Sequence, residues 1–286
     1  MPRLALAVVG HVEVVTFLSV DRLPESGAIV HAVPLLETAA GGGAVVAVQM
    51  ARLSGRRVPF FTALGRDRLG AQAVTELEAL GLDLHVAWRD APTRRGISMV
   101  DASGERTITV IGERLTPHGD DPLPWSELAC CDGVFVTAAD ASALQQARRA
   151  PLLAATPRVR CSELQRAGVR LDALIGSGLD PAERYEPGDL DPEPRLQVAT
   201  EGALGGRLSP GGRFSALPRH EPVRDAYGAG DSFAAGVTAG LAAQWSVAEA
   251  IDLGCHCGMA ALDAPGPYAS QLNRQRAGWT DERSAL

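Results

Sequence analysis

The stretch DAYGAGDSFAAGV, residues 225–237, places a glycine turn directly before an apolar helix. Gly228 and Gly230 allow backbone angles that are closed to other residues. The first N–H groups of a helix have no partner within it and can bind an anion, and Asp231 stands beside them, where it can accept a proton. An Asp at such a place more often only interacts favourably with the helix dipole. The stretch alone therefore fits a phosphoryl-transfer site and an ordinary helix start about equally.

The chain contains no lysine, because all 27 of its basic residues are arginine. This excludes phosphate-binding loops and protein kinases that depend on a lysine, as well as a Schiff base to pyridoxal phosphate. If the protein moves a phosphoryl group, backbone amides, arginines and a metal ion must neutralise the charge. A GC-rich coding bias explains the missing lysines equally well, and the exclusion holds under either explanation.

Length, charge and hydropathy limit the class of protein. With 286 residues, of which 46% are hydrophobic, the chain is long enough for one large α/β unit or two small domains with a substantial core. Its net charge of -7 gives no basic patch, so nucleic acid is not an expected partner. Residues 4–10 are apolar but too short to span a membrane, and no signal-peptide cleavage pattern follows them. We expect a cytoplasmic enzyme without a membrane partner.

The five cysteines lack the spacing typical of a zinc site or of a disulfide framework. Cys255, His256 and Cys257 are neighbours, but side chains one and two positions apart on a helix point in different directions. No metal-ligating residue is therefore predicted, and the cysteines are expected to be reduced thiols packed within the fold.

Short, almost continuously hydrophobic runs of strand length alternate with patterns of helix length. The runs cover residues 4–9, 58–63, 84–88, 133–137, 151–155, 172–175 and 195–199. The helical patterns cover residues 43–54, 67–80, 140–149 and 160–167. Continuous apolar strands with helices between them are typical of a mostly parallel, doubly wound α/β sheet flanked by helices.

Two segments break this alternation, residues 12–38 and 94–112. The second contains two strand-like runs, 96–100 and 106–111, around a polar turn, and it is predicted to form a β-hairpin. Strands without helices between them do not easily join a parallel sheet, so we expect the two segments to pair as a small β-sheet that acts as a lid. Without internal repeats or a long linker, residues 1–286 are interpreted as a single α/β domain.

Several glycine motifs occur in order along the chain. They are Gly10-His11-Val12, Gly41-Gly42-Gly43-Ala44, Leu53-Ser54-Gly55, Gly65-Arg66-Asp67-Arg68-Leu69-Gly70, Thr200-Glu201-Gly202-Ala203-Leu204-Gly205 and the stretch from Asp225 to Asp231. In this order they resemble the ribokinase or PfkB family of sugar and nucleoside kinases, over nearly the whole chain. The last motif is the most specific, and the ordered set is stronger than any one member. The resemblance implies a ribokinase-like α/β fold.

The resemblance also implies transfer of the γ-phosphoryl group of ATP to an alcohol, with magnesium as a cofactor. Asp231 matches the family's catalytic base, and Gly228, Ala229 and Gly230 match its anion hole. A carboxylate within hydrogen-bond reach can take the proton of the attacking hydroxyl, and oriented amides can stabilise charge on the transferring group.

The run Gly41, Gly42 and Gly43 falls where the family's substrate hydroxyls approach the backbone. Such a run more often marks a simple loop before a helix, and its place in the ordered set is what favours substrate binding. The Asn that usually follows the glycine pair is missing here, because its position aligns with about Val46.

The nucleotide and two ions are assigned by the same resemblance. The residues assigned to the nucleotide are Thr200, Gly202 and Gly205 for the phosphates and ribose, and Cys255 and His256 for the adenine. Asp225 and Gly266 match positions near a monovalent-cation site, although Tyr227 replaces a frequent Thr. The family's Asn-x-x-Glu element, which helps to organise magnesium, aligns with residues 177–180, so that Asp180 or Glu183 would have to replace it.

A further departure concerns the Asp that grips sugar hydroxyls after the first strand of the family. Val15 stands in its place, and Glu13 is the nearest carboxylate on that segment. Because side chains alternate along a strand, Glu13 shares the side of Val15 and is predicted to lie in the substrate pocket. The alternative is a solvated Glu13, or one paired with Arg106 or Arg22. A sugar pocket rejects analogues through several hydrogen bonds, so these losses imply a changed substrate.

The leading hypothesis is a kinase for a small carbohydrate or related polyol. A nucleoside kinase is the second choice, since only 5% aromatic residues give little support for base stacking. A catalytically weak ligand-binding or regulatory protein is a third, favoured by the missing Asn residues and opposed by Asp231. A dinucleotide-dependent oxidoreductase lacks its glycine fingerprint after the first strand. The expected partners are a sugar-like substrate and, through exposed lid strands, a second copy of the chain.

Overall fold

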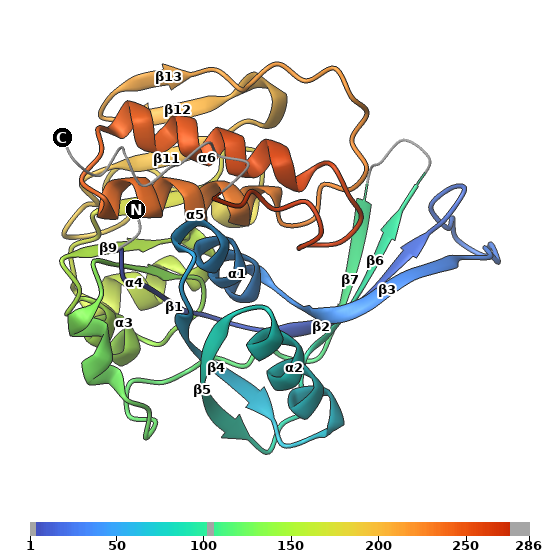
Figure 1. Ribbon diagram of the computed structural model, residues 1–286, viewed down its shortest axis with the longest axis horizontal. Helices are drawn as coiled ribbons and strands as arrows, with labels where there is room; N and C mark the ends of the chain where they lie inside the picture. The colour runs from blue at the N-terminus through green and yellow to red at the C-terminus, as the bar shows by residue number, and fades with distance from the viewer. Residues whose placement is uncertain (1–3, 102–105, 275–286) are drawn as a thin grey trace.

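The computed structural model describes residues 4–101 and 106–274, arranged as Figure 1 shows. In these residues the main sheet has nine strands, in the order β13-β12-β11-β10-β9-β8-β1-β4-β5. The strands are β1 (Leu6–Val9), β4 (Val58–Gly65), β5 (Leu82–Arg89), β8 (Gly133–Val136), β9 (Leu152–Ala155), β10 (Ala173–Ser177), β11 (Gln197–Thr200), β12 (Gly206–Ser209) and β13 (Gly212–Phe214). All strands from β11 to β5 pair in parallel, which confirms the doubly wound α/β sheet. The antiparallel edge formed by β12 and β13 was not predicted.

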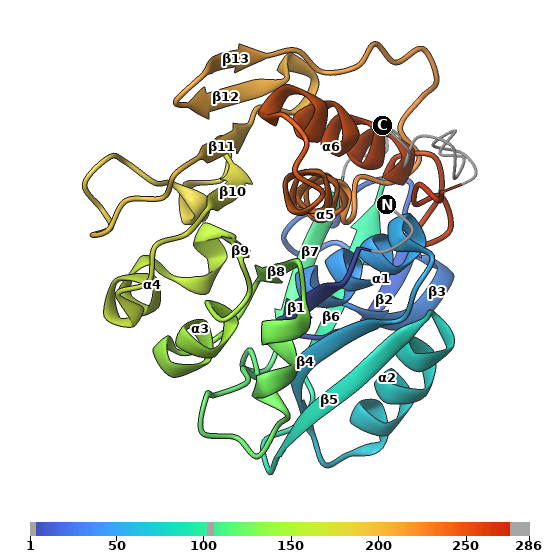
Figure 2. The same cartoon turned by 60° about the vertical axis from the view of Figure 1, so that its left-hand side comes forward.

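Helices cover both faces of the main sheet, as Figure 2 shows. One face packs against α1 (Gly42–Ser54), α2 (Arg68–Ala79), α5 (Ala229–Ala242) and α6 (Val247–Ala261). The other face packs against α3 (Ala141–Ala147) and α4 (Cys161–Ala167). Short 3-10 turns lie at Trp125–Cys130 (η1), Pro157–Val159 (η2), Pro181–Glu183 (η3) and Gly202–Leu204 (η4). Within the described ranges, we find no helix with both the length and the apolar character needed to cross a bilayer.

Alternation along the strands explains why two cores form. Val8 and Phe60 belong to the core beneath α1, α5 and α6, whereas their neighbours Val9 and Phe61 belong to the core beneath α3 and α4. Successive side chains of a strand point to opposite faces of a sheet, so a strand buried on both faces must be apolar at every position. This is the physical basis of the continuous hydrophobic runs in the sequence.

A second, smaller sheet projects from the main one, as the blue and green strands of Figure 1 show. Its strands are β2 (Glu13–Ser19), β3 (Val33–Ala40), β6 (Arg95–Val100) and β7 (Arg106–Ile111), in the order β3-β2-β6-β7. β2 pairs in parallel with β6, so the two segments that interrupt the α/β pattern do pair with each other. β6 and β7 are antiparallel, and the predicted turn between them lies at residues 102–105, outside the described residues. The single-domain interpretation of the chain stays a prediction.

Two glycines start the helices that meet at the centre of the molecule. Gly41, with a φ of 90°, precedes α1, and Gly228, with a φ of 76°, precedes α5. Both values lie in the region that favours glycine. A Cβ on Gly228 would lie 2.9 Å from Cγ1 of Val45, so the turn before α5 packs directly on α1. The two helix N-termini are thereby held side by side.

Candidate active site

Asp231 and the glycine run that starts α1 face each other. Asp231 lies in the first turn of α5 and is partly buried. A Cβ built on Gly42 would lie 2.8 Å from Oδ1 of Asp231 and 3.6 Å from Cε1 of His11. The carboxylate of the predicted base therefore points at the backbone predicted to bind the substrate.

The backbone amides around Asp231 are largely unpartnered. In the part of the chain that the structure describes, the N–H groups of Gly228, Gly230 and Asp231 donate to no acceptor, and that of Ala229 donates to the carbonyl of Ala226 at 3.4 Å. A Cβ on Gly230 would meet nothing within 4 Å, so the space beside this residue is open. The predicted residues 228–230 thus lie at an open helix N-terminus, and the amide of Asp231 itself extends the set.

Glu13 is buried and belongs to a chain of polar contacts that ends at Gly41. The N–H of Gly41 donates to the hydroxyl of Tyr227 at 3.1 Å, and that hydroxyl donates to Oε1 of Glu13 at 3.3 Å. Oε2 of Glu13 lies 3.2 Å from Nε of Arg94. Glu13 does pair with an arginine, but the expected partners were wrong, since Arg94 takes the place given to Arg106 or Arg22.

Tyr227 stays protonated in this chain and can therefore donate. Burial first, and then the negative charge of Glu13, raise the pKa of Tyr227 well above its usual value. Its ring meets Phe17 edge-on, with 4.9 Å between centroids. Tyr227, which replaces the Thr frequent in the family, thus holds Glu13 close to Gly41.

Two positions where the family has hydrogen-bonding groups are closed and apolar. Val15 is fully buried, and its Cγ2 lies 3.1 Å from the point where a Cβ on Gly96 of β6 would stand. Val46 is fully buried in the core beneath α1. Neither side chain can hold a sugar hydroxyl, so the acceptor must be recognised by other residues.

The two carboxylates proposed to replace the Asn-x-x-Glu element both contact Arg158 of η2. Nε of Arg158 donates to Glu183, and its NH2 lies 3.1 Å from Oδ2 of Asp180. Oε2 of Glu183 also accepts the N–H of Ser177 at 2.9 Å. This places both carboxylates at the carboxyl end of β10, which is where ligands bind in parallel sheets.

Electrostatics distinguish the two titratable groups nearest Gly42. Burial raises the pKa of Asp231; Arg158 and Arg106 oppose this, while the negative charges of Glu183 and Glu13 add to it. Burial, followed by the guanidinium groups of Arg114, Arg94 and Arg158, holds the pKa of His11 well below its usual value. At neutral pH, His11 is therefore neutral, and the ring lies against the glycine run without adding positive charge.

The residues assigned to the nucleotide lie in two places. Thr200 ends β11, Gly202 begins the η4 turn and Gly205 follows that turn, directly before β12. Cys255 and His256 lie on α6, where Sγ of Cys255 is 4.0 Å from the carbonyl of residue 215, just after β13. Burial raises the pKa of the Cys255 thiol to about 11, so it is an inert thiol at neutral pH.

Asp225 and Gly266 are brought together, as the resemblance implies. Oδ1 of Asp225 accepts the N–H of Tyr227 at 2.8 Å, and Oδ2 accepts the N–H of Gly266 at 2.9 Å. Asp225 is completely buried. The carboxylate therefore ties the loop before α5 to the segment that follows α6.

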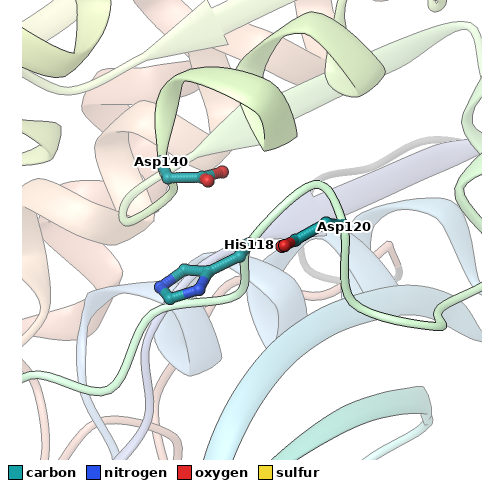
Figure 3. Close-up of side chains that lie close together, drawn as sticks. All are labelled: His118, Asp120 and Asp140. Carbon is teal, nitrogen blue, oxygen red and sulfur yellow. The ribbon is translucent and has the colours of Figure 1, made fainter.

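A group of three possible oxygen and nitrogen ligands, His118, Asp120 and Asp140, lies near the start of α3 (Figure 3). Their ligand atoms are within 4.8 Å of one another. Oδ1 of Asp140 already accepts the N–H of Ala143 at 2.8 Å, which caps α3, and the N–H of Gly119 at 3.0 Å. His118 and Asp120 are exposed. The arrangement is explained by helix capping, and we infer no metal site from it.

A hollow of about 700 Å³ opens beside β10, β11 and β12. Its wall includes Glu183 and the loop residues 184–187, but not Asp231, Glu13 or Gly42. It therefore reaches Glu183 but does not include the place where Asp231 and the glycine run meet.

Sequence reasoning missed several residues of this cleft. Tyr227 was noted only as a departure, yet its hydroxyl joins two predicted substrate residues. Arg94 and Arg158 carry no local signal, since each finds its carboxylate on a distant segment. His11 follows the first strand directly, and its place in a glycine motif was the one available sign.

Comparison of the fold finds close likeness to sugar and nucleoside kinases. A ribokinase from Thermotoga maritima superimposes with a TM-score of 0.76 and 19% identity, covering 96% of this chain and 98% of that one. An adenosine kinase from Sinorhizobium meliloti gives 0.76 and 21%, covering 99% and 100%. Arabidopsis thaliana ribokinase, solved with ribose and ATP, gives 0.74 and 18%, covering 95% and 96%. At these identities the likeness shows the shared ribokinase-like fold.

Comparison of the sequence gives the family. A search of curated proteins finds no match. The profile of the pfkB family of carbohydrate kinases, however, matches residues 4–162 and 193–274, which include every segment that forms the cleft around Asp231 except the loop with Asp180 and Glu183. The chain therefore belongs to the pfkB family of carbohydrate kinases and is a small-molecule kinase.

Proposed function

We propose that the protein transfers the γ-phosphoryl group of ATP to a hydroxyl of a small carbohydrate or polyol, with Asp231 as the general base. The observation that carries the proposal is the approach of Oδ1 of Asp231 to the backbone of Gly42, beside unpartnered amides. An acceptor hydroxyl bound at Gly41, Gly42 and Gly43 would lie between the carboxylate and the helix N-terminus. Glu13, held by Tyr227 and Arg94, would bind a second hydroxyl.

In the reacting complex, the hydroxyl gives its proton to Asp231 as its oxygen bonds to the γ-phosphorus. The bond from the γ-phosphorus to the bridging oxygen breaks, and ADP leaves with that electron pair. A carboxylate with a raised pKa accepts a proton more readily than an exposed aspartate, provided that it is ionised before the reaction. Burial of Asp231 therefore serves the proposed role.

Negative charge on the transferring group would be met by the amides of Gly228, Ala229, Gly230 and Asp231. Fixed N–H dipoles in a partly dry site stabilise such charge without reorganisation. Arg158, which acts electrostatically on Asp231, would place a guanidinium group near the phosphates, although it is already paired with Asp180 and Glu183. Thr200, Gly202, Gly205, Cys255 and His256 are proposed to hold the rest of the nucleotide.

Magnesium would be held by the carboxylate of Asp180 or Glu183, whose oxygens already contact Arg158 and the N–H groups of Ala182 and Ser177. Oxygen donors suit this hard cation, and both side chains lie at the carboxyl end of β10 with Arg158. The ion would neutralise charge on the nucleotide phosphates when bound. A monovalent cation near Asp225 and Gly266 has less support, because both carboxylate oxygens of Asp225 already accept backbone N–H groups.

A nucleoside acceptor finds less support from the contacts of the cleft. The aromatic rings of Phe17 and Tyr227 are buried against each other, so neither offers a free face to a base. A ligand-binding protein with weak catalysis is favoured by Val15 and Val46, which close two positions for hydrogen-bonding groups. In such a ligand-binding protein, the unpartnered amides beside the Asp231 carboxylate would have no evident role.

We also propose that two copies associate through the small sheet. Its edge strands are β3 and β7, and β3 exposes Val33 (64%) and Leu35 (42%). Edge strands with apolar side chains invite pairing with another chain. Light scattering of the native chain should then give a dimer, and Leu35→Lys should give a monomer; a native monomer would contradict this.

Turnover separates the kinase from the ligand-binding protein. The purified chain, ATP, magnesium and a panel of sugars, polyols and nucleosides are tested for acceptor-dependent ADP release, and products are identified by phosphorus NMR. The proposal expects a phosphorylated sugar or polyol. If acceptors raise the melting temperature but no product forms with any of them, the ligand-binding alternative stands instead.

A further inference from the structure

Four arginines from separate segments lie near enough to His11 or Asp231 to act on the charge of one or both of these residues. Arg94 precedes β6, Arg106 begins β7, Arg114 follows β7 and Arg158 lies in η2. Three of them act on the charge of His11, and two of them on that of Asp231. Part of this positive charge can serve the phosphates of the nucleotide, so the arginines that bear on the acceptor are those without a carboxylate partner inside the chain.

Two of the four arginines are neutralised within the protein. Arg158 contacts Glu183 and Asp180, at the carboxyl end of β10. Arg94 contacts Glu13, and both side chains of this pair are nearly buried. These two guanidinium groups therefore have defined partners and defined places.

The other two arginines, Arg106 and Arg114, lack such partners. Over residues 4–101 and 106–274, no carboxylate lies within ion-pair distance of either one. Nε of Arg106 is buried and has no hydrogen-bond acceptor in that part of the chain. NH1 of Arg114 donates only to the carbonyl oxygen of Arg158, at 2.8 Å.

A guanidinium group that is removed from water without an anion is costly. Burial and the neighbouring charges of Arg94 and Arg158 lower the pKa of Arg114, so the folded chain disfavours the charged form of this side chain. Arg106 and Arg114 are each partly buried and partly open to solvent, so an anion from outside the chain can reach them. The planar fork of arginine matches the paired oxygens of a carboxylate or phosphate.

The placement of Arg106 points to the acceptor side of the cleft. Arg106, Ile108 and Val110 alternate along β7 and share one face, opposite Val100, Ser98 and Gly96 of β6. This face continues across β6 to Val15 and Phe17 of β2, which are buried. Ile108 and Val110 are exposed, at 37% and 46%, so this part of the face is open to solvent.

The loss of an acidic residue fits the same conclusion. Val15 occupies the position where a carboxylate was expected, and it contributes neither charge nor hydrogen bonds. A carboxylate there would repel an anionic acceptor, whereas a valine does not. Glu13, the remaining carboxylate of β2, is already neutralised by Arg94.

We propose that the acceptor carries an anionic group, a carboxylate or a phosphate on the carbohydrate, which Arg106 and Arg114 bind while its hydroxyl faces Asp231. The substrate class is therefore a sugar acid or a sugar phosphate. The claim that the hydroxyl faces Asp231 rests on the proposed function. The claim that Arg106 and Arg114 bind an anion does not depend on that function.

The test compares acceptors in matched pairs. Gluconate against glucose and glycerate against glycerol report a carboxylate; fructose 6-phosphate against fructose and ribose 5-phosphate against ribose report a phosphate. Each compound is measured for ADP release with ATP, and for its shift of the melting temperature in the presence of a non-hydrolysable ATP analogue. An anionic member should exceed its neutral partner at least tenfold in kcat/KM and shift the melting temperature further.

Variants assign the effect to the arginines. Arg106→Gln and Arg114→Gln should each raise the KM or Kd of the anionic acceptor roughly ten- to hundredfold, the range expected for a lost hydrogen bond to a charged group. The KM of ATP should not change. The matched control is Arg95→Gln, because Arg95 lies on β6 of the same sheet and is exposed; it should behave as the native chain. Arg106→Lys, which keeps the charge but loses the fork, should fall between native and Gln.

The possible failures are distinct. If neutral sugars are the better acceptors and both Gln variants treat them normally, the anionic acceptor is wrong while the kinase stands. If the KM of ATP rises instead of that of the acceptor, the arginines bind the nucleotide, and the inference is again wrong. If no compound is phosphorylated but an anion still shifts the melting temperature of the native chain and not of Arg106→Gln, the proposed function fails and the anion site stands.

Discussion

Oδ1 of Asp231 and the backbone of Gly42 leave no room for a methyl group between them, since a Cβ on Gly42 would stand 2.8 Å from that oxygen. Gly42→Ala is therefore expected to displace the carboxylate. Because the crowded atom is the end of a side chain, and alanine favours a helix, the free energy of unfolding should hardly change. The kcat should fall by up to roughly 100-fold, as expected for a misplaced reacting group. Full activity of a folded Gly42→Ala would show that this approach has no catalytic use.

Gly230 and Gly228 should respond to alanine in opposite ways. At Gly230 a Cβ meets nothing within 4 Å and would occupy space that is now open beside the N-terminus of α5. Gly230→Ala should fold as well as the native chain or up to about 1 kcal/mol better, yet lose roughly 100-fold in kcat/KM for ATP. Retained activity would argue against a phosphate at this place.

Gly228→Ala should instead destabilise the fold. Gly228 has a φ of 76°, and its Cβ would lie 2.9 Å from Val45. The backbone alone costs roughly 1–2 kcal/mol, and the contact adds to this. Gly168→Ala is the matched control, because Gly168 has a φ of 60° and open space around it. Denaturant unfolding should rank Gly228→Ala below Gly168→Ala; equal losses would remove the packing of this turn on α1 from the explanation.

Tyr227→Phe tests whether the hydroxyl of Tyr227 positions Glu13 and Gly41. Its removal should cost about 1 kcal/mol of stability and raise the KM of the acceptor, with a smaller effect on kcat. Tyr268→Phe is a matched control, since the Tyr268 hydroxyl donates to the carbonyl of Ala39 at 2.6 Å. The control should lose similar stability without a change in KM. If both variants change KM alike, the role of Tyr227 is only structural.

The pKa of Asp231 predicts how pH changes stability. Because burial raises this pKa in the folded chain, ionisation of Asp231 opposes folding at neutral pH, and the penalty disappears as pH falls below the pKa of the unfolded chain. The groups that act on Asp231 are Arg158, Arg106, Glu183 and Glu13, so the measurement is made on a background in which they are unchanged. Asp231→Asn should melt higher than the native chain at pH 7, and the difference should vanish near pH 3. A lower melting temperature at pH 7 would contradict the raised pKa.

Most of the α/β framework could be predicted from the sequence, for a simple physical reason. Strands that are buried on both faces are apolar throughout, so β1, β4, β8, β9 and β10 appear as continuous runs. β12 and β13 could not be found in this way, because they are short, form the sheet edge and include Gly206, Arg207 and Ser209. Their pairing depends on the neighbouring β11.

The residues of the candidate site show the same difference between local patterns, which can be recognised in the sequence, and contacts between distant segments, which cannot. Asp231 and Gly42 were identified from local glycine motifs, which mark places where the backbone takes special angles. The contacts of Tyr227 with Glu13, and of Arg158 with Glu183, join segments far apart in the chain and depend on packing. An arginine partner for Glu13 was considered only as an alternative, with Arg106 or Arg22 in mind, and the structure has Arg94 there. The pocket role of Glu13 stays a prediction.

The most direct test of the central claim measures Asp231→Asn in two ways, with Asp83→Asn as a control at an exposed position on β5. Calorimetry gives the Kd of ATP and of the best acceptor, and quenched-flow gives the rate of phosphoryl transfer. We predict that Asp231→Asn binds both ligands within a few-fold of the native Kd and transfers roughly 10²- to 10⁴-fold more slowly. Transfer at the native rate by a folded Asp231→Asn would show that another group takes the proton.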